Sequence, residues 1–240
     1  MYLIITKQPR GQTMPDDTVS IIAETVFPML PELSEDQQDL SLAVFRVLAR
    51  GQRATHEDIA SEAGVSTETI DEFLKDHSGV YHDSQGFVVG YLGLSISGMP
   101  HKFQIGEQHL NTWCAWDSLF LPELLDHTAL VESKVPGSDE IVRLTVSPDG
   151  VERQSPESAV MTVILPDLDR AETLAAVHKD IISSFCHHVH FFPDRKSAES
   201  WVQKRPDKYA VISVAEGFEL GRRMNRHLHG HALAKRSHTV

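Results

Sequence analysis

The N-terminal part of the chain has apolar positions at the spacing of short helices. After an irregular or loosely helical stretch at residues 1–32, this spacing predicts three helices that begin after Ser34, Thr55 and Ser66. Each of these hydroxyls can accept a hydrogen bond from the first turn that follows it. Residues 80–81 and 87–91 then have the alternation of a β-hairpin. Three helices and a hairpin in this order are typical of a winged-helix module.

The charges of the second and third predicted helices argue against DNA as a partner of this module. Between Thr55 and Asp76, Lys75 is the single Lys or Arg. The acidic residues of the same stretch are Glu57, Asp58, Glu62, Glu68, Asp71, Glu72 and Asp76. Phosphate groups would be repelled by such a surface, since DNA binding needs Lys and Arg. We therefore expect a packing or lid domain.

After residues 98–100 (Gly-Met-Pro) the pattern changes to strands separated by helices. Strands are predicted at His101–Ile105, Thr128–Lys134, Glu140–Ser147, Ala159–Leu165 and Tyr209–Val214. Helices are predicted from Asn111 or Thr112 to near Pro122, at Asp169–Ser184, at Ser197–Lys204 and at Ala215–His229, with a frayed polar tail after Gly230. We predict an α+β protein with an N-terminal winged-helix-like domain, residues 1–97, and a core domain, residues 98–240. The core is expected to be a mixed or antiparallel sheet with packed helices.

Composition indicates where in the cell the protein acts and which kinds of partner it has. The chain has 240 residues, 41% of them hydrophobic, and a net charge of −12. No apolar run approaches the roughly 18–20 residues of a membrane span, and the N-terminus lacks a signal-peptide pattern. Two cysteines do not make a disulfide framework. We expect a cytoplasmic protein without membrane or nucleic-acid partners, and a monomer because no heptad seam is present.

One of the two cysteines lies in the stretch Asn111–Phe120, which also contains a carboxylate three residues further on. If a helix begins here with Asn111 or Thr112 as its cap, Cys114 and Asp117 share one face. Cys114 would then lie in the first turn, where the helix dipole favours a thiolate. A buried, inert cysteine beside a capping aspartate fits the spacing equally well.

The second cysteine begins the run Cys-His-His-Val-His at residues 186–190. An extended backbone would place Cys186, His188 and His190 on one side. Together with Cys114 they could bind zinc, which leaves a zinc-stabilised hydrolase as an alternative. That signal is weak because the chain has no short Cys-x-x-Cys pair. Two thiols and an aspartate suit a soft, thiophilic metal such as mercury better than a hard ion.

At these residues the sequence resembles the organomercurial (alkylmercury) lyases. The matching blocks follow one another along most of the chain, at residues 90–94, 113–117, 119–122, 144–148, 184–186, 189–192 and 214–221. The resemblance implies an enzyme that splits carbon–mercury bonds by protonolysis and gives a hydrocarbon and Hg(II). His187 departs from the pattern, because many members have a second cysteine there; we expect this change to affect product handling and not cleavage.

The resemblance also implies roles for three residues. Cys114 and Cys186 would bind mercury as thiolates, and Asp117 would move a proton from a thiol to the departing carbon. Desolvation by neighbouring aromatic rings would raise the pKa of Asp117 for this task. Mercury is substrate and product, so no cofactor is implied. Low-molecular-weight thiols would accept the Hg(II), with a mercuric reductase as a further candidate acceptor. The alternative function is a non-catalytic winged-helix regulator that responds to metals or thiols.

Overall fold

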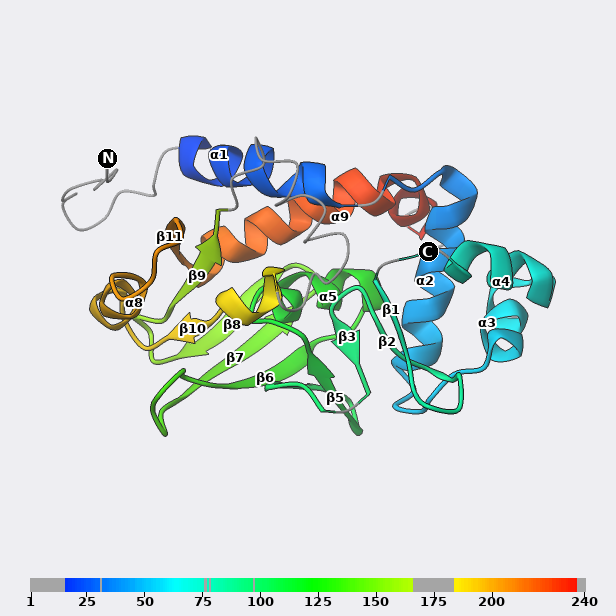
Figure 1. Cartoon of the computed structure of the whole chain (residues 1–240), viewed down its shortest axis with the longest axis horizontal. Helices are drawn as coiled ribbons and strands as arrows, with labels where there is room; N and C mark the ends of the chain where they lie inside the picture. The colour runs from blue at the N-terminus through cyan, green and yellow to red at the C-terminus, as the bar shows by residue number, and fades with distance from the viewer. Residues whose placement is uncertain are drawn as a thin grey trace.

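The computed structural model describes residues 16–30, 32–75, 77, 79–96, 98–165 and 184–236. In this part of the chain, helices pack on one face of a large antiparallel sheet, and a smaller sheet lies beside them (Figure 1). The predicted α+β class is therefore confirmed. The helix predicted at residues 169–184 lies outside the described residues except at its last position.

The N-terminal helices are α1 (Asp16–Val26), the short 3-10 helix η1 (Phe27–Met29), α2 (Glu35–Leu48), α3 (His56–Ala63) and α4 (Thr67–Lys75). Of these, α2, α3 and α4 begin where local capping predicts. The hydroxyls of Ser34, Thr55 and Ser66 accept backbone N–H groups of the helices they precede. These caps satisfy orphan donors of the first turn and define where each helix begins.

The large sheet has the strand order β1-β2-β3-β5-β4-β6-β7-β8, with antiparallel neighbours throughout. Its strands are β1 (Val80–His82), β2 (Val88–Tyr91), β3 (Leu94–Ser95), β4 (His101–Ile105), β5 (Gln108–Thr112), β6 (Ala129–Lys134), β7 (Ile141–Ser147) and β8 (Gly150–Ser155). The predicted hairpin is thus the end of a longer sheet, because β3 joins β2 to β5. The winged-helix description is not confirmed, and the division between residues 97 and 98 stays a prediction.

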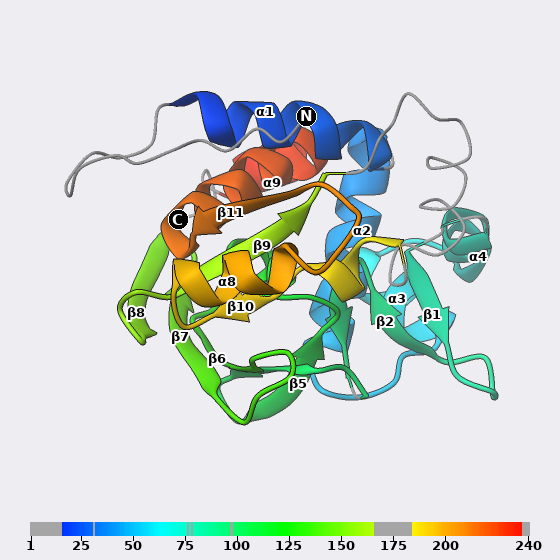
Figure 2. The same cartoon turned by 60° about the vertical axis from the view of Figure 1, so that its left-hand side comes forward.

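The small sheet has the order β10-β9-β11 and is also antiparallel. It consists of β9 (Val160–Ile164), β10 (Phe191–Phe192) and β11 (Tyr209–Ser213), with α8 (Arg195–Val202) packed against it. Figure 2 shows this sheet beside α9 (Val214–Arg236), the long helix that follows β11 directly. Every residue of β9 is buried, so this strand lies at the centre of the second part of the core.

The helix α9 is longer than the sequence predicts. It was expected to end at His229 and to be followed by a frayed tail, but it continues to Arg236 through a kink at His229. The side chain of Gln38 in α2 accepts hydrogen bonds from the backbone N–H groups of His231 and Ala232, at 3.0 and 3.3 Å. Ala232 is buried as well. Packing against α2 therefore holds a segment that its own sequence would leave frayed.

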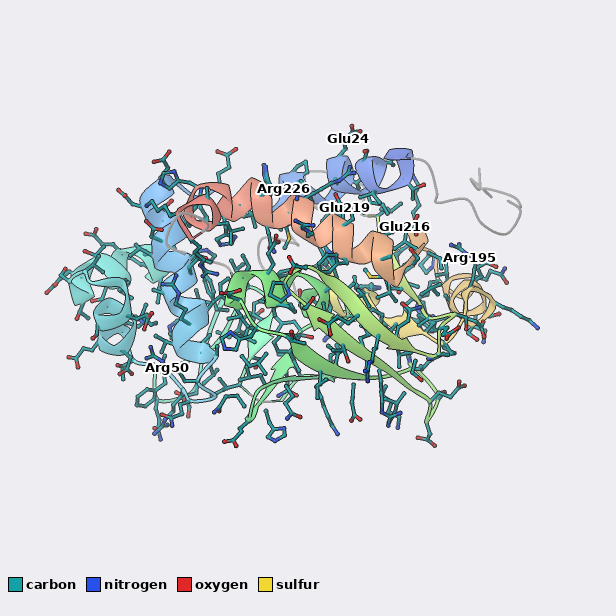
Figure 3. The ribbon with its side chains drawn as sticks, turned by 180° about the vertical axis from the view of Figure 1, so that it is seen from behind. Glu24, Arg50, Arg195, Glu216, Glu219 and Arg226 are labelled. Atoms are coloured by element: carbon teal, nitrogen blue, oxygen red, sulfur yellow. The ribbon has the colours of Figure 1, made fainter. Side chains whose placement is uncertain are left out.

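Two glycines bring α9 against α5 (Asp117–Leu125), the buried helix that begins near the first cysteine. A Cβ atom at Gly221 would lie 2.7 Å from the Cβ of Phe120, and one at Gly217 would lie 2.9 Å from Leu119 Cδ1. The outer side of α9 is charged: Figure 3 labels Glu219 and Arg226 there, and the Arg226 guanidinium lies 3.4 Å from the Glu219 carboxylate. Among the described helices, each is too short or too polar to cross a lipid bilayer.

Candidate active site

The first cysteine lies in a turn between β5 and α5, and not in a helix. Asn111 and Thr112 are the last residues of β5 and cap nothing, while α5 begins at Asp117 with Trp116 before it. The expectation that Cys114 lies in the first turn of a helix is therefore wrong, and so is the dipole argument for its thiolate. The Thr112 hydroxyl instead donates to the Cys114 carbonyl at 2.9 Å and holds the turn.

The helix α5 also runs past its predicted end. It continues through Pro122 to Leu125, because the burial of Leu124 and Leu125 holds its last turn in the core. Trp116, at the start of this helix, donates its indole N–H to the carbonyl of Gly217 at 3.1 Å. This hydrogen bond to Gly217 and the close approach of Phe120 to Gly221 fix the position of the helix that bears Asp117.

The carboxyl group of Asp117 is held from two sides. Its Oδ2 accepts a hydrogen bond from the backbone N–H of Cys114 at 2.6 Å. On the other side lies Gly93, where an added Cβ would be 2.7 Å from Asp117 Cγ. Gly93 has a φ of +101° and its carbonyl accepts from the N–H of Trp113 at 2.9 Å. Glycine is required here both for the backbone conformation and for the space that the carboxyl occupies.

The second cysteine is not in an extended segment, contrary to expectation. Cys186–His188 form the 3-10 turn η2, in which the N–H of Val189 bonds to the Cys186 carbonyl at 3.2 Å. The N–H of Ala115 donates to the carbonyl of Val189, also at 3.2 Å. This bond ties the two cysteine-bearing segments together although they lie far apart in the sequence.

The two histidines proposed as zinc ligands have other partners. His188 Nδ1 lies 2.7 Å from the Tyr209 hydroxyl, and His190 Nε2 lies 2.8 Å from the carbonyl of His187. The predicted zinc set is therefore not brought together.

Among the described residues, the group that could hold a metal is Cys114, Asp117 and Cys186. The ligand atoms of these three residues lie within 4.8 Å of one another, and all three residues are buried. The structure thus brings together the three residues that the sequence predicted as the site.

Burial sets the protonation of this group. Desolvation raises the pKa of Asp117 to about 7, although hydrogen bonds from the Cys114 and Trp113 segment oppose the shift. Desolvation also raises the pKa of the Cys114 thiol well above its usual range, with further contributions from Cys186 and Asp117. Near neutral pH, Cys114 therefore rests as a neutral thiol beside a carboxyl that can both accept and release a proton.

A small cavity of about 60 Å³ adjoins the group. Asp117, Cys186 and His229 are its polar lining residues, whereas Cys114 lies outside the lining. The apolar lining residues are Val26, Leu30, Phe45, Leu92, Trp113, Trp116, Phe120, Leu124, Phe185, Met224 and Leu228, with Gly93 completing the wall. Such walls exclude water and leave the cysteine and the acid as the reactive groups of the cavity.

The fold and the site together define a protein that binds a soft, thiophilic metal between two buried thiols beside a proton carrier. The family model for alkylmercury lyase (MerB) matches residues 94–226. The alkylmercury lyase of Staphylococcus epidermidis is 37% identical over 181 residues, which are 75% of this chain and 79% of that protein. The alkylmercury lyase of Bacillus cereus is 35% identical over 193 residues, 80% and 84% of the two chains. The chain belongs to the alkylmercury lyase family.

A solved structure has the same fold. The crystal structure of the mercury-bound form of MerB2 aligns with a TM-score of 0.68 at 20% identity, covering 87% of this chain and 99% of that one. The family assignment favours an enzyme over the metal-responsive regulator that was the alternative function.

Two residues of the site were missed by sequence reasoning. Gly93 lies in one of the blocks that resemble the family, at residues 90–94, so a signal for it was present. The sequence predicts His229 as the last residue of a helix before a frayed polar tail, and its burial depends on contacts with α2 that the sequence does not display.

Proposed function

We propose that this protein cleaves carbon–mercury bonds by protonolysis, with Cys114 and Cys186 as mercury ligands and Asp117 as the proton shuttle. The observation that supports this most strongly is the convergence of two sulfur atoms and a carboxylate within 4.8 Å in a buried site. Mercury(II) prefers soft thiolate ligands, and the leaving carbon needs a proton as its bond to mercury breaks.

The first step joins the organomercurial to one cysteine. Because Cys186 lines the cavity and Cys114 does not, the Cys186 sulfur is the first to meet a substrate R–Hg–SR′. A bond from this sulfur to mercury forms, the bond from mercury to SR′ breaks, and the thiol proton leaves with the released R′SH. The exchange is charge-neutral overall, which suits an apolar cavity.

The second step cleaves the carbon–mercury bond. The Cys114 sulfur bonds to mercury while its proton passes to ionised Asp117, and Asp117 then gives that proton to carbon. The electron pair of the Hg–C bond stays with carbon, which becomes RH, and Hg(II) is left between the two thiolates. A carboxyl with a pKa of about 7 suits both the uptake and the release of this proton.

The product requires an acceptor, because a bis-thiolate complex holds Hg(II) tightly. Two low-molecular-weight thiols can displace the metal by thiol exchange and return their protons to the cysteines, and a mercuric reductase is a further candidate acceptor. The reaction balances without a cofactor. We propose that the protein acts as a cytoplasmic monomer in this cycle.

The test is benzene release from phenylmercury acetate with excess thiol, measured by gas chromatography. Wild-type protein should release benzene, whereas Cys114→Ser and Cys186→Ser should each lose at least about a thousandfold in rate, as expected when a residue of a concerted catalytic unit is removed. Asp117→Asn should still bind one equivalent of mercury but release no benzene. Full activity of Cys186→Ser would show that the two-thiolate mechanism is wrong.

A matched control for the aspartate variant lies just after the same helix. Asp126 follows the last turn of α5, is exposed and has a φ of +56°, a conformation that asparagine adopts readily. Asp126→Asn removes the same charge as Asp117→Asn and should leave benzene release unchanged.

A further inference from the structure

A chain of buried hydrogen bonds leads from the surface to the cavity and ends at His229. The ring of His229 is 1% exposed, and its Nε2 lies 2.8 Å from the Ser41 hydroxyl. The Tyr91 hydroxyl donates to Ser41 at 2.9 Å and lies 3.4 Å from His77 Nε2. At the far end, the backbone N–H of Gly79 donates to His77 Nδ1 at 3.2 Å. Ser41 and Tyr91 are fully buried, while His77 is half-buried.

The backbone amide of Gly79 fixes the tautomer of His77 at the start of this chain. Because Gly79 donates to Nδ1 of His77, a neutral His77 carries its proton on Nε2 and donates to the Tyr91 oxygen. Tyr91 donates to Ser41, which leaves the Ser41 hydroxyl proton available to Nε2 of His229. With the Ser41 proton directed to Nε2, a neutral His229 carries its own proton on Nδ1. Burial lowers the pKa of both histidines, that of His229 to about 4, so both rings are neutral at physiological pH.

The Nδ1 atom of His229 is buried and has no partner among the described residues. A buried polar atom without a partner is costly in a folded protein, so it is rare without a function. His229 lines the same cavity of about 60 Å³ as Asp117 and Cys186. His229 lies at the kink of α9, where it has φ −131° and ψ 16°. A donor without an acceptor in a small apolar cavity is suited to an acceptor that arrives with the substrate.

We infer that His229 is a binding residue for the sulfur ligand that mercury brings with it, and that its Nδ1–H stabilises this sulfur as it departs as a thiolate. The inference rests on the proposed function. In that reaction, a cysteine sulfur replaces R′S⁻ on mercury inside an apolar cavity. The negative charge that develops on the departing sulfur has lost its contact with water, and a pre-oriented N–H donor compensates for that loss. His229 keeps its own proton throughout, while the departing thiolate takes the proton of the attacking cysteine.

The chain from His77 through Tyr91 and Ser41 favours the His229 tautomer that carries its proton on Nδ1. A histidine free to change tautomer would present either a donor or an acceptor to the cavity. With the Tyr91 proton directed to Ser41 and the Ser41 proton directed to Nε2, His229 presents Nδ1 as a donor. Ser41 and Tyr91 are positioning residues, and they act on the substrate only through the imidazole.

The tautomer can be measured in the resting protein. In protein with ¹⁵N-labelled histidine, NMR should show His229 protonated on Nδ1 and bare on Nε2, assigned by the signals lost in His229→Asn. Tyr91→Phe should convert this single tautomer into a mixture, because Ser41 then has no donor that fixes its orientation. A wild-type His229 protonated on Nε2 would overturn the inference.

The proposed hydrogen bond from His229 to the departing sulfur is tested by varying the acidity of the thiol that leaves. Phenylmercury complexes of thiols of graded acidity are mixed with protein, and quenching of tryptophan fluorescence follows the displacement step. His229→Leu should slow displacement about tenfold or more for weakly acidic alkyl thiols, as expected for a lost hydrogen bond to a charged group. For strongly acidic aryl thiols the loss should be under about twofold, since such thiolates need less stabilisation.

His229→Asn is the matched variant, because the amide nitrogen of asparagine occupies nearly the place of Nδ1 and also donates. It should restore most of the rate that His229→Leu loses. An equal loss across the thiol series, or no rescue by asparagine, would mean that His229 only supports the fold. If wild-type protein releases no benzene, the proposed function itself fails, and the tautomer measurement still decides whether the donor exists.

Discussion

At the scale of single residues, the burial that raises the pKa of Asp117 also lowers the stability of the folded protein where this carboxyl is ionised. Its pKa is raised from an ordinary 3.8 to about 7 by burial. The folded protein therefore holds this proton more tightly than the unfolded chain does. The contribution of such a group to stability is complete below about pH 4 and is lost as the pH rises through 7. Above pH 7 the ionised carboxylate remains buried at its full desolvation cost.

Asp117→Asn should remove this pH dependence. Between about pH 4 and 7, the Asp117 carboxyl alone lowers the free energy of unfolding of wild type by about 1.4 kcal/mol per pH unit. Asparagine does not titrate, so the variant should gain stability relative to wild type as the pH rises, and the gain should level off above pH 7. Urea unfolding with a reductant present measures this difference. The exposed Asp126→Asn serves as the control, and parallel curves for wild type and Asp117→Asn would contradict the raised pKa.

At the scale of elements, the contact between α5 and α9 positions the acid. Gly221 allows the two helices to approach until Phe120 fills the space where a side chain would lie. Trp116, which also adjoins Gly221, reaches Gly217 of the same helix. The small residues of α9 therefore determine how deeply α5, and with it Asp117, is buried.

Gly221→Ala should disturb this contact. Its Cβ would meet Phe120 Cβ at 2.7 Å, an overlap that only a backbone shift relieves, so we expect a loss of about 1–3 kcal/mol in stability. Benzene release should fall as well, because α5 moves. Gly230→Ala in the same helix is the matched control: nothing lies within 4 Å of its added Cβ, and alanine is the better helix former by up to about 1 kcal/mol. Thermal unfolding of both variants measures the contrast.

The elements that sequence reasoning predicted well are those with local signals. Ser34 and Thr55 define their helices through bonds to residues three positions away, and the pattern of β4 is visible in its own alternation. The strands that were missed depend on neighbours. β3 has two residues, and β8 is a polar edge strand that becomes regular by pairing with β7. A local sequence pattern does not show which short or polar segments will form a strand by pairing with a neighbour.

At the scale of the whole molecule, the candidate site is assembled from segments that meet only in the folded chain. Cys114 and Asp117 follow β5, Cys186 lies in η2, and His229 comes from the kink in α9. The rarity of cysteine and the spacing of Cys114 and Asp117 indicated the candidate groups, and the resemblance to the alkylmercury lyases implied their roles. They could not predict that Cys114 precedes its helix, or that a polar C-terminal segment is held in the core, because both result from long-range packing.

Gln38 and Asp39 are neighbours in α2 that reach the same end of α9 by different interactions. Gln38 is buried, and its amide oxygen accepts two backbone N–H groups just beyond the kink. Asp39 makes an exposed ion pair with Lys235 at 2.6 Å. Exposed pairs contribute about 0–1 kcal/mol, whereas a lost buried acceptor leaves its donors unsatisfied at about 1–3 kcal/mol.

Gln38→Ala should therefore destabilise the protein by about 1–3 kcal/mol, and Asp39→Ala by at most about 0.5 kcal/mol. Urea unfolding gives both values. Gln38→Ala should also slow benzene release, because the turn of α9 that begins at His231 loses its anchor and the adjacent His229 ring loses its fixed place beside the cavity. Equal effects of the two variants would mean that the first helices of the chain do not support the site through α9.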